Sequence, residues 1–326
     1  EKSKEKYVVR LPNKPCKELF DRYDETKNVG ILKDLNKKNS IVKKTKLGPE
    51  IIYIDNKGIQ ISVFIPNTSI TNSKLTKTLD NNQSLKNAIR AMVTLNLGNF
   101  KLTNTVDIFQ RNELIHNFLK TEGVFGKPMD DDFKLKFNAC WEMHGDVKKY
   151  FGANPQPKFP CHNDITAGNL IKSDVTDEIV ILDFEYAGMN SVLWELANFI
   201  VQTGIELDGD AFVNYLDTVF AEYVKQFNQT QQKPSSEKFK PPSPFADIDK
   251  AKQQLYLYCF AVEVWRTVWG LYQRQIDNMP LGKKFYDDQI EICLGNAEKI
   301  KYLPARQTAF KALLDLDERD KAPILT

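Results

Sequence analysis

Long apolar runs are missing from the sequence. The longest, at residues 179–182 and 255–262, are far shorter than the roughly 20 residues that a membrane-spanning helix needs. The first four residues, Glu-Lys-Ser-Lys, do not have the pattern of a signal peptide. We therefore expect no stable insertion into a membrane.

Cysteine and net charge are also scarce. The five cysteines are scattered, with no Cys-x-x-Cys pair and no spacing typical of a metal site. This pattern indicates reduced thiols and a cytoplasmic protein. Lysine and arginine total 45 against 43 for aspartate and glutamate, so the net charge is +2. The near-balance disfavours a protein that binds nucleic acid over a broad surface.

Apolar residues are plentiful enough for a sizeable core. They make up 42% of the 326 residues, which is too much for a disordered chain. Residues 7–11 predict a strand, residues 16–36 a helix, and residues 51–65 a β-hairpin. Together they suggest a small α+β lobe at residues 1–66.

The rest of the chain, residues 67–326, is mostly helical in pattern. Two features interrupt it. Residues 169–182 predict a second, short hairpin around a polar turn, and residues 229–244 are rich in Gln, Lys, Ser and Pro, which predicts a surface loop. The overall pattern predicts an α+β fold with a mainly helical larger lobe.

The segment HNDITAGN at residues 162–169 carries the most chemical information. Asp164 and Asn169 lie at the two ends of one predicted loop, and Asp183 follows a strand that can pair with the strand after that loop. Carboxylate and amide oxygens suit Mg²⁺, and a further carboxylate can accept a proton from a hydroxyl. The spacing H-x-D-x₄-N followed by D-F-x is typical of kinase-type phosphoryl transfer. A polar turn with an Asp helix cap is the alternative.

With these motifs the sequence resembles the choline/ethanolamine kinases, which belong to the aminoglycoside-phosphotransferase-like branch of the protein-kinase-like fold. The matching segments are HNDITAGN, DFEYAGMN at residues 183–190, and WELANF at residues 194–199. The resemblance implies a two-lobed, protein-kinase-like α+β fold. It also implies ATP and Mg²⁺ as cofactors.

The resemblance implies roles for the residues of the central motifs. Asp164 would orient the acceptor hydroxyl and accept its proton. His162 would brace the catalytic loop rather than transfer protons. Asn169 and Asp183 would hold Mg²⁺ on the ATP phosphates.

The N-terminal lobe resembles the nucleotide-binding part of the same family. Arg10 would reach the ATP phosphates, and Glu25 on the next helix would be its carboxylate partner. Phe64 and Ile65 lie in the strand that leads into the hinge under adenine. The family's phosphate loop precedes the strand at residue 7, so we expect this lobe to lack its first strands. No Walker-type loop occurs elsewhere.

The acceptor site is expected around a group of aromatic residues. Trp265 and Trp269 are four apart, so they share one face of a helix, and aromatic faces attract a quaternary ammonium. The family places a W-x-x-W pair here and a Tyr farther on, which Trp269 and Tyr286 match. Arg266 occupies the position of the first Trp, and Trp265 is displaced by one residue. The alternative is a buried aromatic stripe.

Two further residues complete the predicted acceptor site. Tyr186 matches a family position near the ligand, and Glu185 would supply negative charge to the bound cation. The expected activity is ATP-dependent phosphorylation of choline to phosphocholine, the first step of phosphatidylcholine synthesis. The alternatives are an ethanolamine kinase, another small-molecule phosphotransferase of the aminoglycoside type, and a non-catalytic pseudokinase or binding module. The resemblance also suggests a possible homodimer.

Overall fold

The structure, a computed structural model, describes part of the chain. The described residues are 5–11, 33, 45–55, 59–76, 82–98, 101–123, 131–205, 207, 209–232, 243–275, 287–288 and 290–296. Most of the predicted helix at residues 16–36 lies outside them, as do Glu25 and Tyr286.

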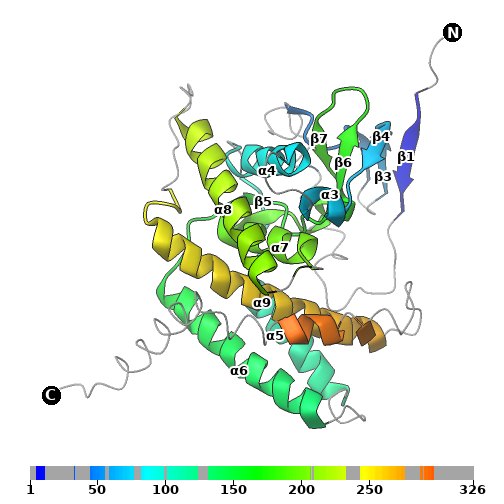
Figure 1. Cartoon of the computed structure of the whole chain (residues 1–326). Coiled ribbons are helices and arrows are strands. Elements are labelled where there is room, and N and C mark those ends of the chain that lie inside the picture. Colours follow the sequence, from blue (N-terminus) through cyan, green and yellow to red (C-terminus); the bar gives the residue numbers. More distant parts are fainter. Residues whose placement is uncertain are drawn as a thin grey trace. The chain divides into compact units, whose positions relative to one another are not determined.

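Figure 1 shows the strands and helices in chain order. The strands are β1 (Tyr7–Arg10), β2 (Ile51–Ile54), β3 (Gln60–Val63), β4 (Asn67–Ser69), β5 (Phe159–Cys161), β6 (Leu170–Ser173), β7 (Ile179–Ile181) and β8 (Gly188–Asn190). The α-helices are α3 (Asn72–Thr76), α4 (Gln83–Asn96), α5 (Ile108–Thr121), α6 (Asp131–Ala153), α7 (Val192–Thr203), α8 (Gly209–Gln231) and α9 (Ile248–Gln275). Two short 3₁₀ turns, η3 (Ala167–Asn169) and η4 (Phe184–Tyr186), stand beside the ribbon strands β6 and β7.

The chain divides into two compact units. The first contains Glu1–Val106 and Pro157–Phe245, and the second contains Asp107–Gln156 and Ala246–Thr326. This is a different division from the predicted lobes at residues 1–66 and 67–326, which stay a prediction.

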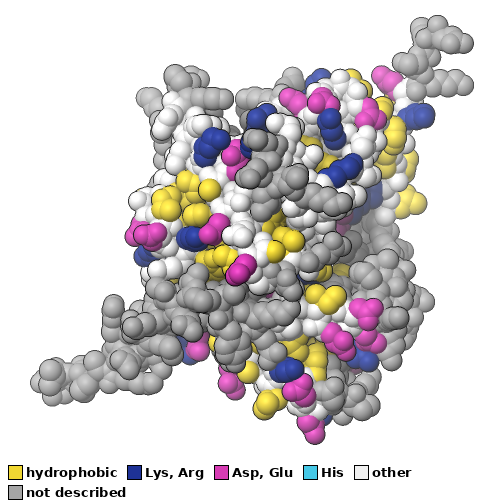
Figure 2. All heavy atoms as spheres, in the orientation of Figure 1, with side chains coloured by type: hydrophobic (Ala, Val, Ile, Leu, Met, Phe, Trp, Pro, Cys, Tyr) yellow, Lys and Arg dark blue, Asp and Glu magenta, His cyan; other side chains and the backbone are white. Residues whose placement is uncertain are grey.

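A three-stranded antiparallel sheet in the order β1-β3-β2 lies in the first unit. It contains the predicted hairpin, since β2 and β3 pair across the turn that begins at Asp55. Strand β1 is an edge strand, and Figure 2 shows hydrophobic side chains exposed along it. The exposed residues include Tyr7, Val8 and Val9.

The second predicted hairpin is also present. Strands β6 and β7 pair antiparallel, with Leu170 opposite Ile181, and the polar turn between them is exposed. Strand β4 pairs with the outer side of β6, and β5 pairs with β8. The sequence analysis did not predict β4, β5 and β8, because each pairs with a strand that is distant in sequence.

Three helices form much of the core of the first unit. Every residue of α7 is buried except Gln202. Ser191 caps the helix by accepting a hydrogen bond from the Leu193 N–H. Helices α4 and α8 contact each other. Helix α8 continues to Gln231, so the loop predicted from residue 229 begins later than expected.

Helices α5, α6 and α9 belong to the second unit, where α9 contacts both of the others. Stacked aromatic rings join α5 and α6, with His116 and Trp141 centred 3.9 Å apart.

Among the described residues of either unit, no helix is both long and apolar enough to cross a membrane.

Candidate active site

The loop that carries the predicted catalytic motif leaves β5 at Cys161 and enters η3 at Ala167. Asn163 has a φ of 67°, in the left-handed region that Asn tolerates better than most residues. Its side-chain amide donates to the Tyr186 carbonyl at 3.0 Å, and its oxygen accepts from the amide of Asn190 at 2.7 Å. Asn163 thus joins the catalytic loop to the segment that follows Asp183.

His162 is fully buried and braces this loop. Its Nε2 lies 2.8 Å from the carbonyl of Leu182, and its Nδ1 accepts the backbone N–H of Asp164 at 3.2 Å. Burial lowers the pKa of His162 from 6.5 to about 4, so the ring is neutral at pH 7. A neutral ring that donates through Nε2 and accepts at Nδ1 satisfies both contacts. This arrangement supports the predicted bracing role.

Asp164 and Asn169 are in direct contact. The Asn169 amide donates to the backbone carbonyl of Asp164 at 2.9 Å and to its carboxylate at 3.2 Å. Both amide hydrogens are therefore engaged, and no partner is found for the Asn169 Oδ1 within the described parts of the chain. The backbone N–H of Leu182 donates to the carbonyl of Asn169 at 2.8 Å, which brings Asp183 beside it.

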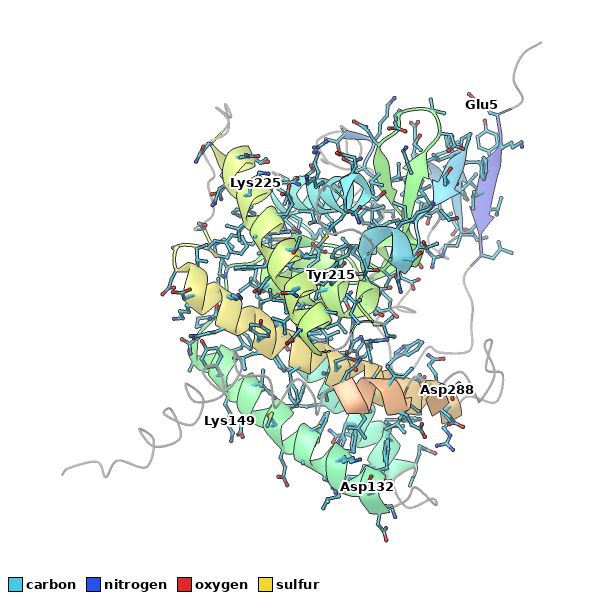
Figure 3. The ribbon with its side chains drawn as sticks, in the orientation of Figure 1. Glu5, Asp132, Lys149, Tyr215, Lys225 and Asp288 are labelled. Atoms are coloured by element: carbon cyan, nitrogen blue, oxygen red, sulfur yellow. The ribbon has the colours of Figure 1, made fainter. Side chains whose placement is uncertain are left out.

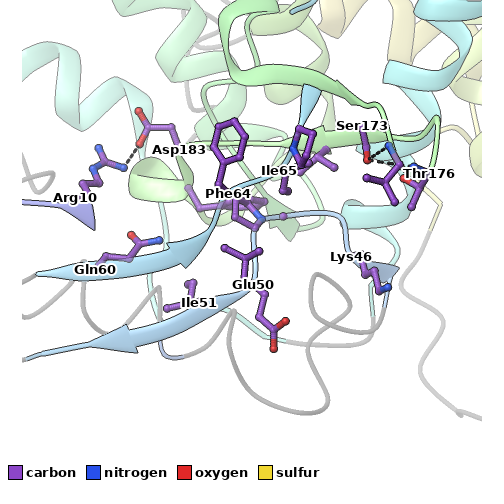
Figure 4. A pocket seen from close by; sticks show the side chains of 17 residues that line it. Arg10, Lys46, Glu50, Ile51, Gln60, Phe64, Ile65, Ser173, Thr176 and Asp183 are labelled. Atoms are coloured by element: carbon purple, nitrogen blue, oxygen red, sulfur yellow. Dashed lines mark hydrogen bonds and ion pairs between the residues drawn. The ribbon is translucent and has the colours of Figure 1, made fainter. Parts of the chain in front are cut away.

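Asp183 follows β7 in a left-handed conformation, with a φ of 61°. Its carboxylate pairs with the guanidinium of Arg10, at the end of β1. The same guanidinium pairs with Glu185 at 2.5 Å. Figure 4 shows Arg10 and Asp183 pointing toward each other. One cation therefore bridges the two acids of the Asp-Phe-Glu motif, 173 and 175 residues away in sequence.

A cavity of about 500 Å³ lies in the first unit, between the β1-β3-β2 sheet and the β6–β7 ribbon. Arg10 and Asp183 lie at one end, and Lys46, Ser173 and Thr176 at the other (Figure 4). Phe64 and Ile65 line the middle, as the hinge prediction requires.

The backbone of Ile65, in the predicted hinge, has unused hydrogen-bonding capacity. The carbonyl of Ile65 accepts a hydrogen bond from the side chain of Asn67 at 2.7 Å. The backbone N–H of Ile65 has no partner within the described segments. A backbone N–H beside an apolar slot is suited to an acceptor nitrogen of a flat heterocycle.

Two oxygen-bearing side chains, of which only Asp183 lines this cavity, fit a hard divalent cation. Asn169 offers an amide oxygen and Asp183 a carboxylate, which are ligand types that Mg²⁺ prefers. Among the described residues no three His, Cys, Asp or Glu side chains form a metal cluster. Two protein ligands still suit Mg²⁺, because this ion usually completes its shell with phosphate and water oxygens.

Glu195 is a site residue that the sequence analysis did not assign. It lies on α7, is fully buried, and accepts the backbone N–H groups of His162 and Asn163, the latter at 3.1 Å. Burial raises its pKa from 4.5 to about 7. Its place in the WELANF segment was the available signal, but nothing in the spacing connected that segment to the catalytic loop.

The predicted acceptor residues Trp265 and Trp269 lie on α9, in the second unit. Between residues 254 and 272 of this helix, every residue is buried except these two. Arg266 is buried and pairs with Glu263 at 3.2 Å. The displacement by one residue therefore places Trp265, and not Arg266, on the same partly exposed face as Trp269. Their role in binding stays a prediction, as do those of Glu185 and Tyr186.

Known proteins with sequences similar to this chain include kinases of small amino alcohols. The chain is 22% identical over 209 residues to Protein LicA of Haemophilus influenzae, covering 64% of this chain and 70% of that protein. Other matched proteins include a choline kinase from Schizosaccharomyces pombe and an ethanolamine kinase from Saccharomyces cerevisiae, aligned over 19% and 17% of their lengths.

Solved structures give the same result for the fold. A choline/ethanolamine kinase family protein from Mesorhizobium loti superposes with a TM-score of 0.66 at 17% identity, covering 94% of this chain and 86% of that one. The choline kinase of Cryptosporidium parvum gives 0.64 at 14% identity, covering 96% and 85%. The fold is thus the predicted kinase-like α+β fold.

The family model described as choline/ethanolamine kinase matches residues 1–286. This match extends over both compact units and includes every motif described above. The chain therefore belongs to the choline/ethanolamine kinase family and is a phosphotransferase.

Proposed function

We propose that this protein transfers the γ-phosphoryl group of ATP to the hydroxyl of a small amino alcohol, with choline preferred over ethanolamine. The observation that carries the chemistry is the contact of Asn169 with Asp164, next to Asp183 and Arg10. General base, metal ligands and a cation for the phosphates thus come from neighbouring segments of one unit.

The proposed reaction is a direct displacement. The acceptor oxygen attacks the γ-phosphorus, the bond to the β–γ bridging oxygen breaks, and ADP leaves with that electron pair. Asp164 takes the hydroxyl proton. Mg²⁺ held by Asn169 and Asp183 would neutralise charge on the phosphates. His162 and Asn163 keep the loop in place, and Phe64 and Ile65 line the slot for adenine.

Arg10 has a further role in this proposal. Its guanidinium pairs with Asp183 and Glu185, so it lies beside the proposed metal ligand. A guanidinium at this point is suited to bidentate contacts with phosphate oxygens. We infer that Arg10 binds the ATP phosphates. The predicted partner Glu25 stays a prediction, since it lies outside the described residues.

The preference for choline rests on Trp265 and Trp269. Both indoles are partly exposed on one face of a helix whose neighbouring positions are buried. A quaternary ammonium has no N–H groups to donate, so it binds to the faces of aromatic rings. Two indoles on one helix face can provide such a site. A primary ammonium, as in ethanolamine, depends more on carboxylates such as Glu185. Both substrate types occur among the named relatives of this family.

Steady-state kinetics with Mg-ATP and each amino alcohol in turn will test this function. We expect turnover with both and a higher kcat/KM with choline. Trp269→Ala should raise the KM for choline about tenfold and that for ethanolamine much less. Trp141→Ala is the matched control, because Trp141 stacks on His116 within the second unit and is not assigned to the site.

Each other outcome has a definite meaning. Turnover only with ethanolamine would keep the chemistry and reject the choline preference. No turnover with either alcohol, together with tight Mg-ATP binding, would reject the amino-alcohol assignment and favour another acceptor. An unchanged choline KM in both Trp265→Ala and Trp269→Ala would reject the aromatic site.

A further inference from the structure

A chain of buried hydrogen bonds lies beneath the catalytic loop and joins three helices. The hydroxyl of Tyr223 on α8 donates to the Oδ1 of Asn96 on α4 at 2.5 Å. The Nδ2 of Asn96 donates to the carboxylate of Glu195 on α7 at 2.5 Å. All three side chains are at most 1% exposed. Glu195 in turn accepts the N–H groups of His162 and Asn163.

The orientation of Asn96 in this chain is determined by its neighbours. Its Nδ2 also lies 2.8 Å from the carbonyl of Pro160, which can only accept a hydrogen bond. The Nδ2 must therefore face Pro160 and Glu195, and the Oδ1 must face Tyr223. Each hydrogen and the oxygen of the amide has a partner. Asn96 can hold one carboxylate oxygen of Glu195 only in this orientation.

The other carboxylate oxygen of Glu195 holds the catalytic loop. The backbone of the loop has a left-handed conformation at Asn163, and a residue other than glycine adopts this conformation at a cost in free energy. Two backbone N–H groups bonded to a buried carboxylate offset that cost. Because Asp164 is the next residue, the position of its carboxylate depends on this anchor.

We propose that Tyr223 and Asn96 are positioning residues for phosphoryl transfer, which act through Glu195 on the loop that bears Asp164. The proposal rests on the proposed function in one respect, namely that Asp164 is the general base. Neither residue touches the nucleotide cavity. Their effect is therefore on the geometry of the loop and not on ATP binding.

The charge state of Glu195 belongs to the same argument. The groups that face it are the Cys161 thiol on β5, the Tyr223 hydroxyl and the neutral His162. Burial raises the pKa of Cys161 and of Tyr223 well above their ordinary values, so both stay uncharged at pH 7. The Asn96 amide is thus a main support of the ionised carboxylate. Without the Tyr223 hydroxyl, the Asn96 amide loses one of the contacts that fix its orientation. Its hydrogen bond to Glu195 becomes weaker, which favours protonation of Glu195.

Tyr223→Phe in the full chain tests the proposal, with Tyr215→Phe as its matched control. Both tyrosines are fully buried on α8, and the Tyr215 hydroxyl bonds to Thr203 at 2.7 Å, away from the catalytic loop. Figure 3 labels Tyr215 on this helix. Each change deletes one oxygen and keeps the aromatic ring. The readouts are kcat and KM for ATP against pH, and amide hydrogen exchange of residues 162–164.

We expect Tyr223→Phe to lower kcat about tenfold at pH 7, with a KM for ATP within twofold of wild type. The acid limb of its kcat–pH profile should move to higher pH, because Glu195 is protonated more readily. Exchange of the loop amides should become faster. Tyr215→Phe should leave kcat, the kcat–pH profile and the exchange of the loop amides unchanged. It should lower the thermal stability by about as much as Tyr223→Phe does.

Three results would overturn the proposal. They are an unchanged kcat in Tyr223→Phe, an equal loss of kcat in Tyr215→Phe, and unchanged exchange of the loop amides. If the wild-type chain phosphorylates no amino alcohol, the proposed function fails, yet the exchange comparison still tests the anchor. Asn96→Asp is a second variant: a carboxyl group against Glu195 should lower kcat more than Tyr223→Phe does.

Discussion

Asn163 shows how a single residue type can serve both conformation and contact. Protein kinases place Arg between the His and the Asp of this motif, whereas the short amide of Asn163 fits a left-handed turn. Its two ends bond to the Tyr186 carbonyl and to Asn190, in the segment that follows Asp183. The loop that bears the proposed base is therefore tied to the proposed metal-binding segment.

Replacement of the proposed base is the sharpest test at a single residue. Asp164→Asn keeps the size of the side chain but cannot accept the hydroxyl proton, so we expect kcat to fall by about 10²–10⁴-fold. Steady-state turnover with Mg-ATP measures this. Asp177→Asn is the control, because Asp177 lies on an exposed turn and pairs with Lys172. Full turnover by Asp164→Asn would refute the assignment of the base.

His144 gives a prediction about pH and stability. It is buried beside Asn112, and burial lowers its pKa from 6.5 to about 4. The unfolded chain therefore binds a proton before the folded chain does. The stability that neutral His144 contributes is complete above pH 6.5 and is lost as the pH falls toward 4.

We expect the wild-type protein to lose roughly 2 kcal/mol relative to His144→Gln between pH 7 and pH 5. Denaturant unfolding of both proteins at the two pH values measures the difference. A pH-independent difference between the two proteins would show that His144 keeps an ordinary pKa in the fold.

At the scale of elements, the β6–β7 ribbon brings the site together. The strands begin and end within a few residues of Asn169 and Asp183, and the pairing of Leu170 with Ile181 sets them side by side. A shift of this register by one residue would move buried apolar side chains of both strands out of their packed positions. The ribbon is short, yet all three residues of β7 and three of the four in β6 are buried.

The two helix-capping residues Asn82 and Asp107 should contribute differently to the stability of the protein. Asn82 caps α4 by accepting the Leu85 N–H at 3.0 Å, and its amide donates to the carbonyls of Lys74 and Leu75. Asp107 caps α5 through one exposed bond to Gln110. We expect Asn82→Ala to lower the free energy of unfolding by about 2 kcal/mol and Asp107→Ala by about 1 kcal/mol. Thermal or denaturant unfolding measures both, and equal losses would contradict the assigned bonds.

At the scale of the whole molecule, the two compact units have different assigned tasks. The cavity and all the described residues proposed for phosphoryl transfer belong to the first unit, whereas the two tryptophans belong to the second. The proposed nucleotide residues thus all belong to one unit, whereas the proposed acceptor residues come from both, since Glu185 and Tyr186 lie in the first.

Mg-ATP should therefore protect the first unit directly. At about 100 times its Kd, a ligand that binds only the folded state stabilises it by about 2.7 kcal/mol. Hydrogen exchange with and without Mg-ATP measures where this occurs. We expect slower exchange in residues 5–11, 60–66 and 162–185. Protection confined to residues 107–156 and 246–275 would contradict the nucleotide site, and omission of Mg²⁺ should weaken the effect.

Much of the fold follows from local patterns that the sequence shows directly. The hairpins at β2–β3 and β6–β7 are confirmed, because short β-prone runs flank polar turns in both. The family prediction is confirmed too, since the family model matches residues 1–286. Strands β4, β5 and β8 could not be predicted, because no hairpin turn joins them to their partners, which are distant in sequence.

Part of the candidate site was equally beyond local reasoning. Arg10 was predicted to bind phosphates with Glu25 as its partner, but its pairing with Asp183 and Glu185 joins segments that no spacing rule connects. Because Trp265 is displaced by one residue from the family position, the sequence did not decide whether it shares a helix face with Trp269. The burial of Arg266 against Glu263 shows which of the two neighbouring residues shares the face of Trp269.

The sequence alone was sufficient for the family and for the ribbon beside the proposed catalytic motif, because motif spacing and apolar runs around a polar turn are properties of short segments. Tertiary structure was needed to show what anchors that motif. Tyr223 and Asn96 are 127 residues apart, and Asn96 and Glu195 are 99 apart. A buried carboxylate needs donors from whichever elements pack around it, and that packing is a property of the folded chain.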